Sequence, residues 1–147
     1  MTQPNSLENI HANCIRAHGK GLLILGASGA GKSSLSAQLI ALGAVLVADD
    51  RCEIWPQQGR LMARAPSPLA GLLELRGIGI IRLPFFPTTP IAALVHLERT
   101  TQDRMPAPQK ATLAGIAVDL LQFNPGPHFP SALMCYLMGQ RHECEQP

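Results

Sequence analysis

The chain has 147 residues, of which 46% are hydrophobic and 15% are charged, and its formal net charge is +2. This length fits a single domain, and the apolar content is sufficient for a hydrophobic core, which excludes a disordered chain. The small net charge gives no electrostatic indication of nucleic-acid binding. Charged residues make up about 25% of an average domain, so the low value here indicates surface that is covered in a homo-oligomer or by a partner.

No segment is typical of a membrane span or of an export signal. Residues 120–140 lack formal charge, but Pro125, Pro127 and Pro130 interrupt the run, and a spanning helix needs about 20 mostly apolar residues. The polar residues 1–8 lack the basic and then apolar order of a signal peptide. The four cysteines have neither CxxC nor zinc-site spacing, so we expect reduced thiols in a cytoplasmic protein.

The first part of the chain predicts strands and one helix in alternation. Residues 9–16 are interpreted as a first strand, and the apolar run 21–25 as a buried strand. Apolar residues recur at helical spacing over 32–42, and Gly43 follows where a left-handed residue would end that helix. The apolar run 44–48 predicts a second buried strand.

Prolines and glycines divide the rest of the chain into short elements. A hairpin or irregular excursion is expected over 51–71, and an interrupted strand over 72–83. The remaining expectations are a strand at 92–97, a polar loop at 98–110, a strand or helix at 113–123, and a helix at 130–140. We expect flexible ends at 1–8 and 141–147.

Residues 26–33, Gly-Ala-Ser-Gly-Ala-Gly-Lys-Ser, fit the pattern G-x-x-x-x-G-K-[ST] in full. A buried strand before it and an amphipathic helix after it supply the context of a phosphate-binding loop. We expect Lys32 to reach the β and γ phosphates of a nucleotide and Ser33 to bind Mg²⁺ through its hydroxyl. A loop that only caps the helix is the alternative, but Lys32 would then oppose the helix dipole. The predicted nucleotide-binding residues are Gly26, Ala27, Ser28, Gly29, Ala30, Gly31, Lys32, Ser33 and Ser34.

Asp49 and Asp50 follow directly on the apolar run 44–48. Ligands of open α/β sheets lie beyond the carboxyl ends of the strands, so a neighbouring strand would bring these aspartates close to the phosphates. Side chains of a strand alternate between faces, so if the strand continues through Asp49 and Asp50, the two carboxylates cannot both address one point. One of them can bind Mg²⁺ or accept a proton from an attacking hydroxyl, and simple turn chemistry is the alternative.

Together with the segment 74–81, Glu-Leu-Arg-Gly-Ile-Gly-Ile-Ile, these motifs resemble the catalytic domain of bacterial HPr kinase/phosphorylase. The resemblance runs from about residue 11 to residue 138 and matches the short, catalytic-domain-only members. It implies an α/β fold, a P-loop nucleotide-binding domain with a mixed β core similar to phosphoenolpyruvate carboxykinase, over residues 9–140. It also implies ATP and Mg²⁺ as cofactors, an HPr-type phosphocarrier protein as the partner phosphorylated on serine, and a hexamer.

The resemblance also assigns roles to individual residues. Asp49 matches the general base that acts on the serine hydroxyl, and Asp50 matches its partner near the metal. Glu74 matches a glutamate that helps to bind the divalent cation. Arg104 follows a stretch that resembles the one before a family arginine, and that arginine contacts the transferring phosphoryl group. His11 falls where the family has an active-site histidine.

The sequence departs from the family at two places. Ala12 stands where a glycine usually follows the histidine, and His18 is a nearby alternative to His11. In residues 124–130 there is no arginine, whereas longer members carry arginines in the corresponding loop linked to phosphorolysis. The resemblance therefore implies the kinase reaction more strongly than phosphorolysis.

Two other functions are compatible with the P-loop. A small-molecule kinase usually has a lid rich in arginine, but residues 98–110 contain only Arg99 and Arg104. A nucleotide-binding regulatory module without phosphotransfer is the second alternative.

Overall fold

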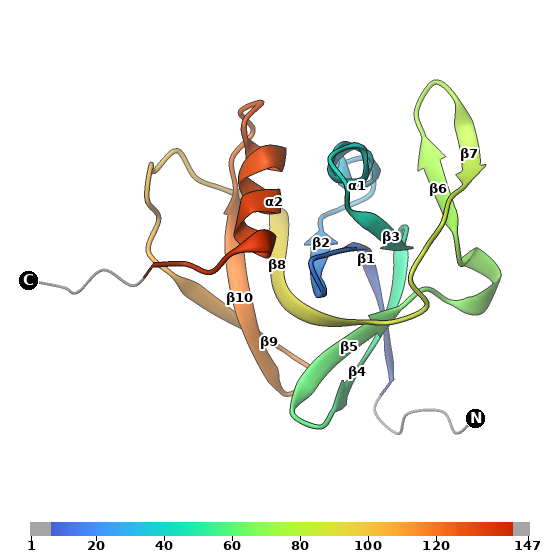
Figure 1. Ribbon diagram of the computed structural model, residues 1–147, viewed down its shortest axis with the longest axis horizontal. Coiled ribbons are helices and arrows are strands. Elements are labelled where there is room, and N and C mark those ends of the chain that lie inside the picture. The colour runs from blue at the N-terminus through green and yellow to red at the C-terminus, as the bar shows by residue number, and fades with distance from the viewer. Residues whose placement is uncertain (1–6, 143–147) are drawn as a thin grey trace, which may run out of the picture.

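The computed structural model describes residues 7–142, and both predicted flexible ends lie partly or largely outside this range (Figure 1). Glu8, which we assigned to the flexible start, already belongs to the first strand. The strands and helices are, in chain order, β1 (Glu8–Ala17), β2 (Lys20–Leu25), α1 (Lys32–Ala41), β3 (Val45–Ala48), β4 (Arg51–Gln57), β5 (Arg60–Arg64), the short 3₁₀ helix η1 (Ser67–Leu69), β6 (Leu72–Leu75), β7 (Gly79–Arg82), β8 (Thr89–Thr100), β9 (Gln109–Leu113), β10 (Ile116–Phe123) and α2 (Phe129–Met138).

Eight strands form one mixed sheet that curls until two of its strands meet. The order is β2-β1-β4-β5-β8-β10-β9, with the eighth strand, β3, paired to β1 beside this path. β2 also pairs with β8, which closes a ring of five strands. The pairings of β8 with β2 and with β10 are parallel, whereas those of β1, β4, β5 and β9 are antiparallel. The expected mixed β core is thus confirmed. The segment 113–123, interpreted as strand or helix, is mainly the strand β10, which pairs with β9 as an antiparallel hairpin.

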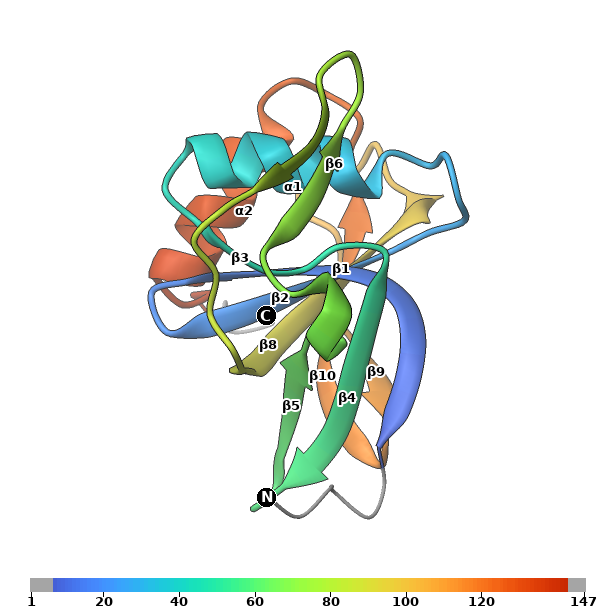
Figure 2. The ribbon, with the colours of Figure 1, turned by 90° about the vertical axis from the view of Figure 1, so that its right-hand side faces the viewer.

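Two hydrophobic clusters lie on opposite faces of the central strands. One cluster lies within the curl of the sheet and includes Cys14 and Leu23, and the other lies under the helices and includes Ile15 and Leu22. Figure 2 shows α1 and α2 on the same side of this sheet. Because neighbouring residues of β1 and β2 point into different clusters, both faces are buried, which explains the continuous apolar run 21–25.

We expected β2 and β3 to be neighbouring strands. This expectation is wrong, because β1 lies between them and pairs with both. β1 is antiparallel to each of them, so β2 and β3 run in the same direction. Their carboxyl ends therefore reach the same edge of the sheet with β1 in between. This arrangement brings the loop after β2 and the aspartates after β3 to the two sides of β1.

The strand-like segment 72–83 forms a separate two-stranded sheet, β6–β7. Its tip contains Gly77 and Gly79, which have φ angles of 87° and 121°, so the two glycines end one strand and begin the next. Figure 1 shows this hairpin standing beside α1 at the outer edge of the molecule. It forms one wall of the site described below.

A polar contact fixes α2 to the sheet. The Tyr136 hydroxyl donates a hydrogen bond to Asp119 of β10, and Lys110 of β9 forms an ion pair with the same carboxylate at 2.6 Å. Burial, followed by the Asp119 contact, raises the pKa of Tyr136 above its ordinary value.

No helix in the described part of the chain is long and apolar enough to cross a membrane.

The burial of each cysteine predicts how readily its thiol is alkylated. Cys14 and Cys52 are buried free thiols, whereas Cys135 on α2 is exposed. Burial and the neighbouring Cys52 raise the pKa of the Cys14 thiol well above its ordinary value, which lowers its thiolate fraction. We expect iodoacetamide to label Cys135 in the native protein and to label Cys14 and Cys52 only after unfolding, as read by peptide mass spectrometry. Labelling of Cys14 at the rate of Cys135 in native protein would contradict this packing.

Candidate phosphate-binding site

The loop between β2 and α1 has the backbone geometry that phosphate binding requires. Gly29 and Gly31 have φ angles of 84° and 106°, a region that side-chain-bearing residues rarely adopt. Gly31 is the N-cap of α1, and no side chain caps this helix. The backbone N–H groups of the first turn are thus left for another acceptor, such as an anion.

Lys32 is a buried cation at the centre of this loop. Its side chain is only 5% exposed, and its Nζ donates a hydrogen bond to the Gly26 carbonyl oxygen at 2.7 Å. Among residues 7–142, no carboxylate lies within 4.0 Å of this ammonium group. A buried charge without a counter-ion is costly, so the environment of Lys32 favours a bound anion.

Glu98, at the end of β8, holds the start of the loop. Its Oε1 accepts a hydrogen bond from the Ala27 N–H at 2.7 Å. The sequence analysis gave Glu98 no role, because nothing in the pattern indicates that the end of β8 lies beside the end of β2. The parallel pairing of these two strands explains the contact.

The Asp49 side chain accepts three hydrogen bonds from three separate segments of the chain. Its Oδ1 accepts hydrogen bonds from the Ser33 hydroxyl and from the Asn13 amide, each at 2.7 Å. Its Oδ2 accepts a third hydrogen bond, from the Glu74 N–H at 3.0 Å. Asp49 therefore links the phosphate loop, β1 and the β6–β7 hairpin.

Asn13 is a site residue that the sequence analysis missed. It is fully buried in β1, and its amide donates one hydrogen bond to Asp49 and another, at 2.9 Å, to the Ser36 hydroxyl of α1. Its Oδ1 accepts the Asp50 N–H at 2.8 Å. The sequence offers no clear indication of this role, because β1 also contains Asn9, His11 and Arg16, and only the structure shows that Asn13 is the buried amide that must be paired.

Asp50 lies close to His11 and not among the donors around Asp49. Strand alternation does not explain this difference, because β3 ends at Ala48. Its backbone has a φ angle of 68°, and this left-handed residue turns the chain from β3 into β4. Its carboxylate lies 4.0 Å from Nδ1 of His11, and both side chains are more than half exposed. The two adjacent aspartates thus have different surroundings, one enclosed by donors and the other open.

A cleft with a volume of about 640 Å³ joins these groups. The phosphate loop and α1 form one side, the β3–β4 turn forms the floor, and the β6–β7 hairpin forms the other side. Its lining residues are Ser28, Gly29, Gly31, Lys32, Ser33, Ser34, Ala37, Gln38, Asp49, Asp50, Glu74, Leu75, Arg76 and Ile78.

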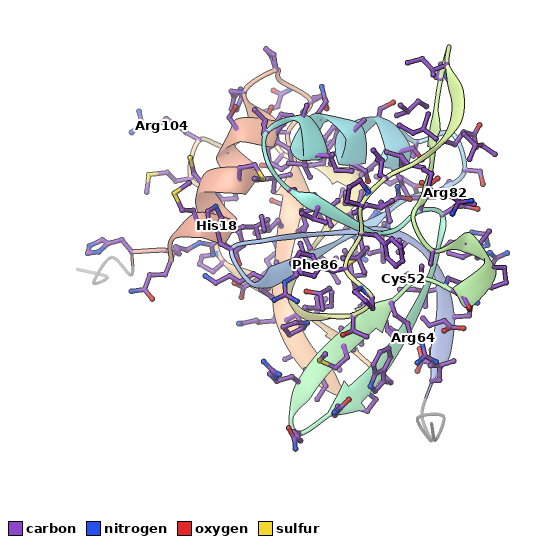
Figure 3. The ribbon with its side chains drawn as sticks, turned by 45° about the vertical axis from the view of Figure 1, so that its right-hand side comes forward. His18, Cys52, Arg64, Arg82, Phe86 and Arg104 are labelled. Carbon is purple, nitrogen blue, oxygen red and sulfur yellow. The ribbon has the colours of Figure 1, made fainter. Side chains whose placement is uncertain are left out.

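Most of the predicted site residues line this cleft, whereas His11, Gly26, Ala27 and Ala30 do not belong to its lining, and His11 reaches it only through its neighbour Asp50. Two further candidates, Arg104 and His18, lie away from it. Arg104 is exposed in the loop after β8 and is absent from the cleft lining, and Figure 3 shows it on the α2 side of the molecule, far from the hairpin residue Arg82. His18 lies at the β1–β2 turn, at the opposite end of the β1–β2 pairing from the phosphate loop. Arg76 lines the cleft instead, although no separate role was expected for it.

The oxygen atoms of the cleft suit a hard divalent cation. No three His, Cys, Asp or Glu side chains within residues 7–142 form a complete metal site. Mg²⁺ usually needs only one or two carboxylates, because substrate phosphates and water supply its other ligands. The Ser33 hydroxyl and the Asp49 carboxylate, 2.7 Å apart beside the phosphate loop, form such a partial set, with Glu74 across the cleft.

The role of Asn13 can be tested through stability. Asn13→Leu removes one donor from Asp49 and leaves the buried Ser36 hydroxyl and the Asp50 N–H without this partner. We expect the free energy of unfolding, measured by urea denaturation, to fall by about 1–3 kcal/mol. Thr89→Val is the control, because Thr89 is equally buried but donates only to the Pro90 carbonyl. Equal losses in the two variants would contradict a special role for Asn13.

Comparison with known proteins shows the family to which the chain is similar. The family model for the HPr Serine kinase C-terminal domain matches residues 4–105. HPr kinase/phosphorylase of Clostridium tetani is 36% identical over 102 residues, and that of Lactiplantibacillus plantarum is 38% identical over 105 residues. These alignments cover 65% and 66% of this chain, but only 33% of each relative. The chain thus spans about a third of the length of the curated relatives that it matches.

A solved structure extends the likeness to most of the fold. The structure described as the Hpr(Ser) kinase/phosphatase from Coxiella burnetii superimposes with a TM-score of 0.76 and 27% sequence identity. The match covers 87% of this chain and 92% of that chain. The expected resemblance to the HPr kinase fold is confirmed, and the chain belongs to the HPr serine kinase C-terminal domain family.

Proposed function

We propose that the chain carries the catalytic centre of an ATP-dependent serine kinase whose substrate is an HPr-type phosphocarrier protein. Curated relatives are named HPr kinase/phosphorylase, and the similar solved structure is described as an Hpr(Ser) kinase/phosphatase. The observation that carries the proposal is the buried Lys32, whose ammonium group contacts the Gly26 carbonyl oxygen at the start of the loop that leads into the uncapped helix α1. The phosphates of ATP would provide the missing negative charge.

We assign Mg²⁺ to Ser33 and Asp49, with Glu74 as a further ligand from the hairpin. Bound Mg²⁺ would offset negative charge on the phosphates during transfer. Asn13 fixes the orientation of the Asp49 carboxylate, and Lys32 binds the phosphate oxygens. This donor set is consistent with the oxygen ligands that Mg²⁺ prefers.

The contacts favour Asp50 as the general base, which exchanges the roles that the resemblance implies for the two aspartates. Three hydrogen bonds hold the Asp49 carboxylate in place beside the phosphate loop, whereas Asp50 lines the open cleft beside His11, where a substrate hydroxyl can approach. In the proposed step, the Asp50 carboxylate accepts the proton of the serine hydroxyl. The serine oxygen then bonds to the γ phosphorus of ATP, and the bond to the bridging oxygen breaks to release ADP.

Further parts of the proposal concern assembly and location. Apolar side chains that are exposed in the single chain are suited to a homo-oligomeric interface, and the family resemblance implies a hexamer. They include Leu42, Ile78, Ile80, Phe85, Phe86, Met105 and Met138. Free thiols at Cys14, Cys52 and Cys135 are consistent with a cytoplasmic location.

The reaction and its base can be tested in one assay. Purified chain, γ-labelled ATP, Mg²⁺ and an HPr-type carrier should yield labelled phosphoserine on the carrier. Asp50→Asn should lower kcat by about 10²–10⁴-fold with little effect on MgADP affinity, because the variant loses the proton acceptor but keeps the phosphate site. Asp49→Asn should instead raise the Mg²⁺ concentration needed for half-maximal rate.

Three outcomes would count against this proposal in different ways. ATP binding without labelled carrier would remove the kinase assignment and favour a regulatory module. Transfer to small metabolites but not to the carrier would favour a small-molecule kinase. Full activity of Asp50→Asn, with loss of turnover at saturating Mg²⁺ in Asp49→Asn, would return the role of base to Asp49.

A second prediction concerns the cation that offsets charge on the transferred phosphoryl group. Arg76 lines the cleft, whereas Arg104 lies outside it. We expect Arg76→Gln to lower kcat by about 10²-fold and Arg104→Gln to leave it nearly unchanged. Arg82→Gln on β7 is the control for charge loss on the same hairpin, because Arg82 does not line the cleft. A large loss in Arg104→Gln alone would support the assignment from family resemblance.

A further inference from the structure

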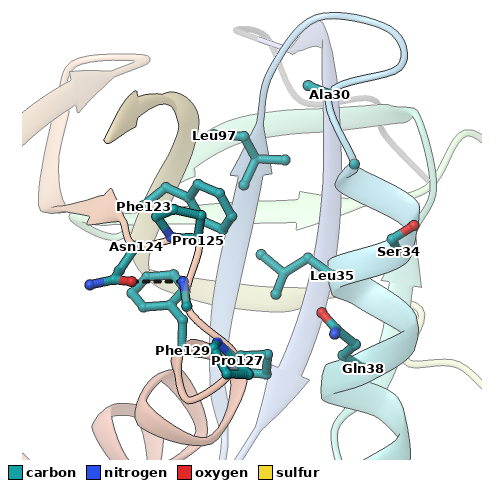
Figure 4. A pocket seen from close by; sticks show the side chains of 13 residues that line it. Ala30, Ser34, Leu35, Gln38, Leu97, Phe123, Asn124, Pro125, Pro127 and Phe129 are labelled. Carbon is teal, nitrogen blue, oxygen red and sulfur yellow. Dashed lines mark hydrogen bonds between the residues drawn. The ribbon is translucent and has the colours of Figure 1, made fainter. Parts of the chain in front are cut away.

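A second, smaller pocket lies on the other side of α1 from the β6–β7 hairpin. Its volume is about 220 Å³, and it lies between the first two turns of α1 and residues 123–130, which join β10 to α2. Figure 4 shows the rings of Phe123, Pro125 and Phe129 on one side of this space and Leu35 on the other. The phosphate site proposed above does not assign any ligand to this pocket.

The pocket shares residues with the phosphate cleft. Gly31, Ser34 and Gln38 line both cavities, so the two spaces meet along one edge of α1. Ser34 and Gln38 are one helical turn apart and lie on the same side of the helix. A ligand whose phosphates rest on the loop before α1 can therefore extend along this edge into the second pocket.

The walls suit a flat, uncharged ring system. Leu35 and Leu97 are buried, and the rings of Phe123 and Phe129 pack edge to face with centroids 5.4 Å apart. None of the described lining residues is charged, and the side chain of Gln38 carries its amide toward the same space in Figure 4. Pockets for drug-sized ligands are about 300–1,000 Å³, so this smaller volume fits one heterocyclic base.

The loop that forms the outer wall is held in place before any ligand binds. Asn124 Oδ1 accepts the Gly126 N–H at 2.8 Å. The exposed His128 ring lies over Gly126, 2.8 Å from the position that a Cβ would take there. Phe129 N–H donates to the Gly126 carbonyl at 3.1 Å and leads directly into α2. The pocket is thus preformed, which lowers the cost of ordering it on binding.

We infer that this pocket binds the base of the nucleotide whose phosphates occupy the proposed kinase site, and that it selects for ring size rather than for one purine. The inference rests on the proposed function for its ligand. Apolar walls hold a base mainly through contact area and stacking, so a purine gains more than a pyrimidine. The Gln38 amide is both donor and acceptor, so it can pair with the edge of adenine or of guanine.

Isothermal titration with four Mg²⁺-loaded ligands, ADP, GDP, CDP and pyrophosphate, tests the inference. We expect ADP and GDP to bind with affinities within about threefold of each other, and at least about tenfold more tightly than pyrophosphate, with CDP in between. Gln38→Phe, which fills the pocket from α1, should lower ADP affinity by about tenfold or more and leave pyrophosphate affinity within about twofold. Ala41→Phe is the control, because Ala41 is exposed on the same helix and lines neither cavity.

The outcomes separate this inference from the proposed function. Equal affinity for ADP and pyrophosphate in the wild-type chain, or unchanged ADP affinity in Gln38→Phe, would overturn the base pocket even if the carrier is phosphorylated. Equal loss of ADP and pyrophosphate in Gln38→Phe would also overturn it, because the variant would then act through the phosphate cleft. The predicted ligand order without phosphate transfer to any carrier would support the pocket and count against the kinase. Failure to bind any of the four ligands would overturn both.

Discussion

The Asp49 carboxylate is the point on which the geometry of the site depends. It accepts hydrogen bonds from β1, from the start of α1 and from β6, through Asn13, Ser33 and Glu74. These three segments are distant in sequence, and the carboxylate needs all three donors because it is only partly exposed to water. The phosphate loop, the central strand and the free-standing hairpin are therefore held in one arrangement, and the cleft lies between them.

The same contacts explain how two adjacent acidic residues can have different functions. The left-handed backbone of Asp50 turns its side chain away from the donors around Asp49. One carboxylate is consequently fixed beside the phosphate loop, and the other is open to a substrate and lies close to His11. In the proposed reaction, these different surroundings assign charge neutralisation to Asp49 and proton transfer to Asp50.

Local patterns predicted the parts of the site that depend on local chemistry. The phosphate loop, the α1 helix and the strand before Asp49 follow from glycine spacing and apolar periodicity, and the structure confirms these elements. The position of β1 between β2 and β3 could not be predicted, because pairing between strands depends on the whole sheet. For the same reason the contacts of Asn13 and Glu98, and the distance of Arg104 from the cleft, were not evident from the sequence.

A crystal structure of the chain with MgADP would test the central claim most directly. The account predicts that Lys32 Nζ contacts a phosphate oxygen, that Ser33 and Asp49 lie around the metal ion, and that Asp50 faces the open side of the terminal phosphate. Phosphates bound away from Lys32, or a metal ion held by Asp50 with Asp49 facing the open side, would contradict it.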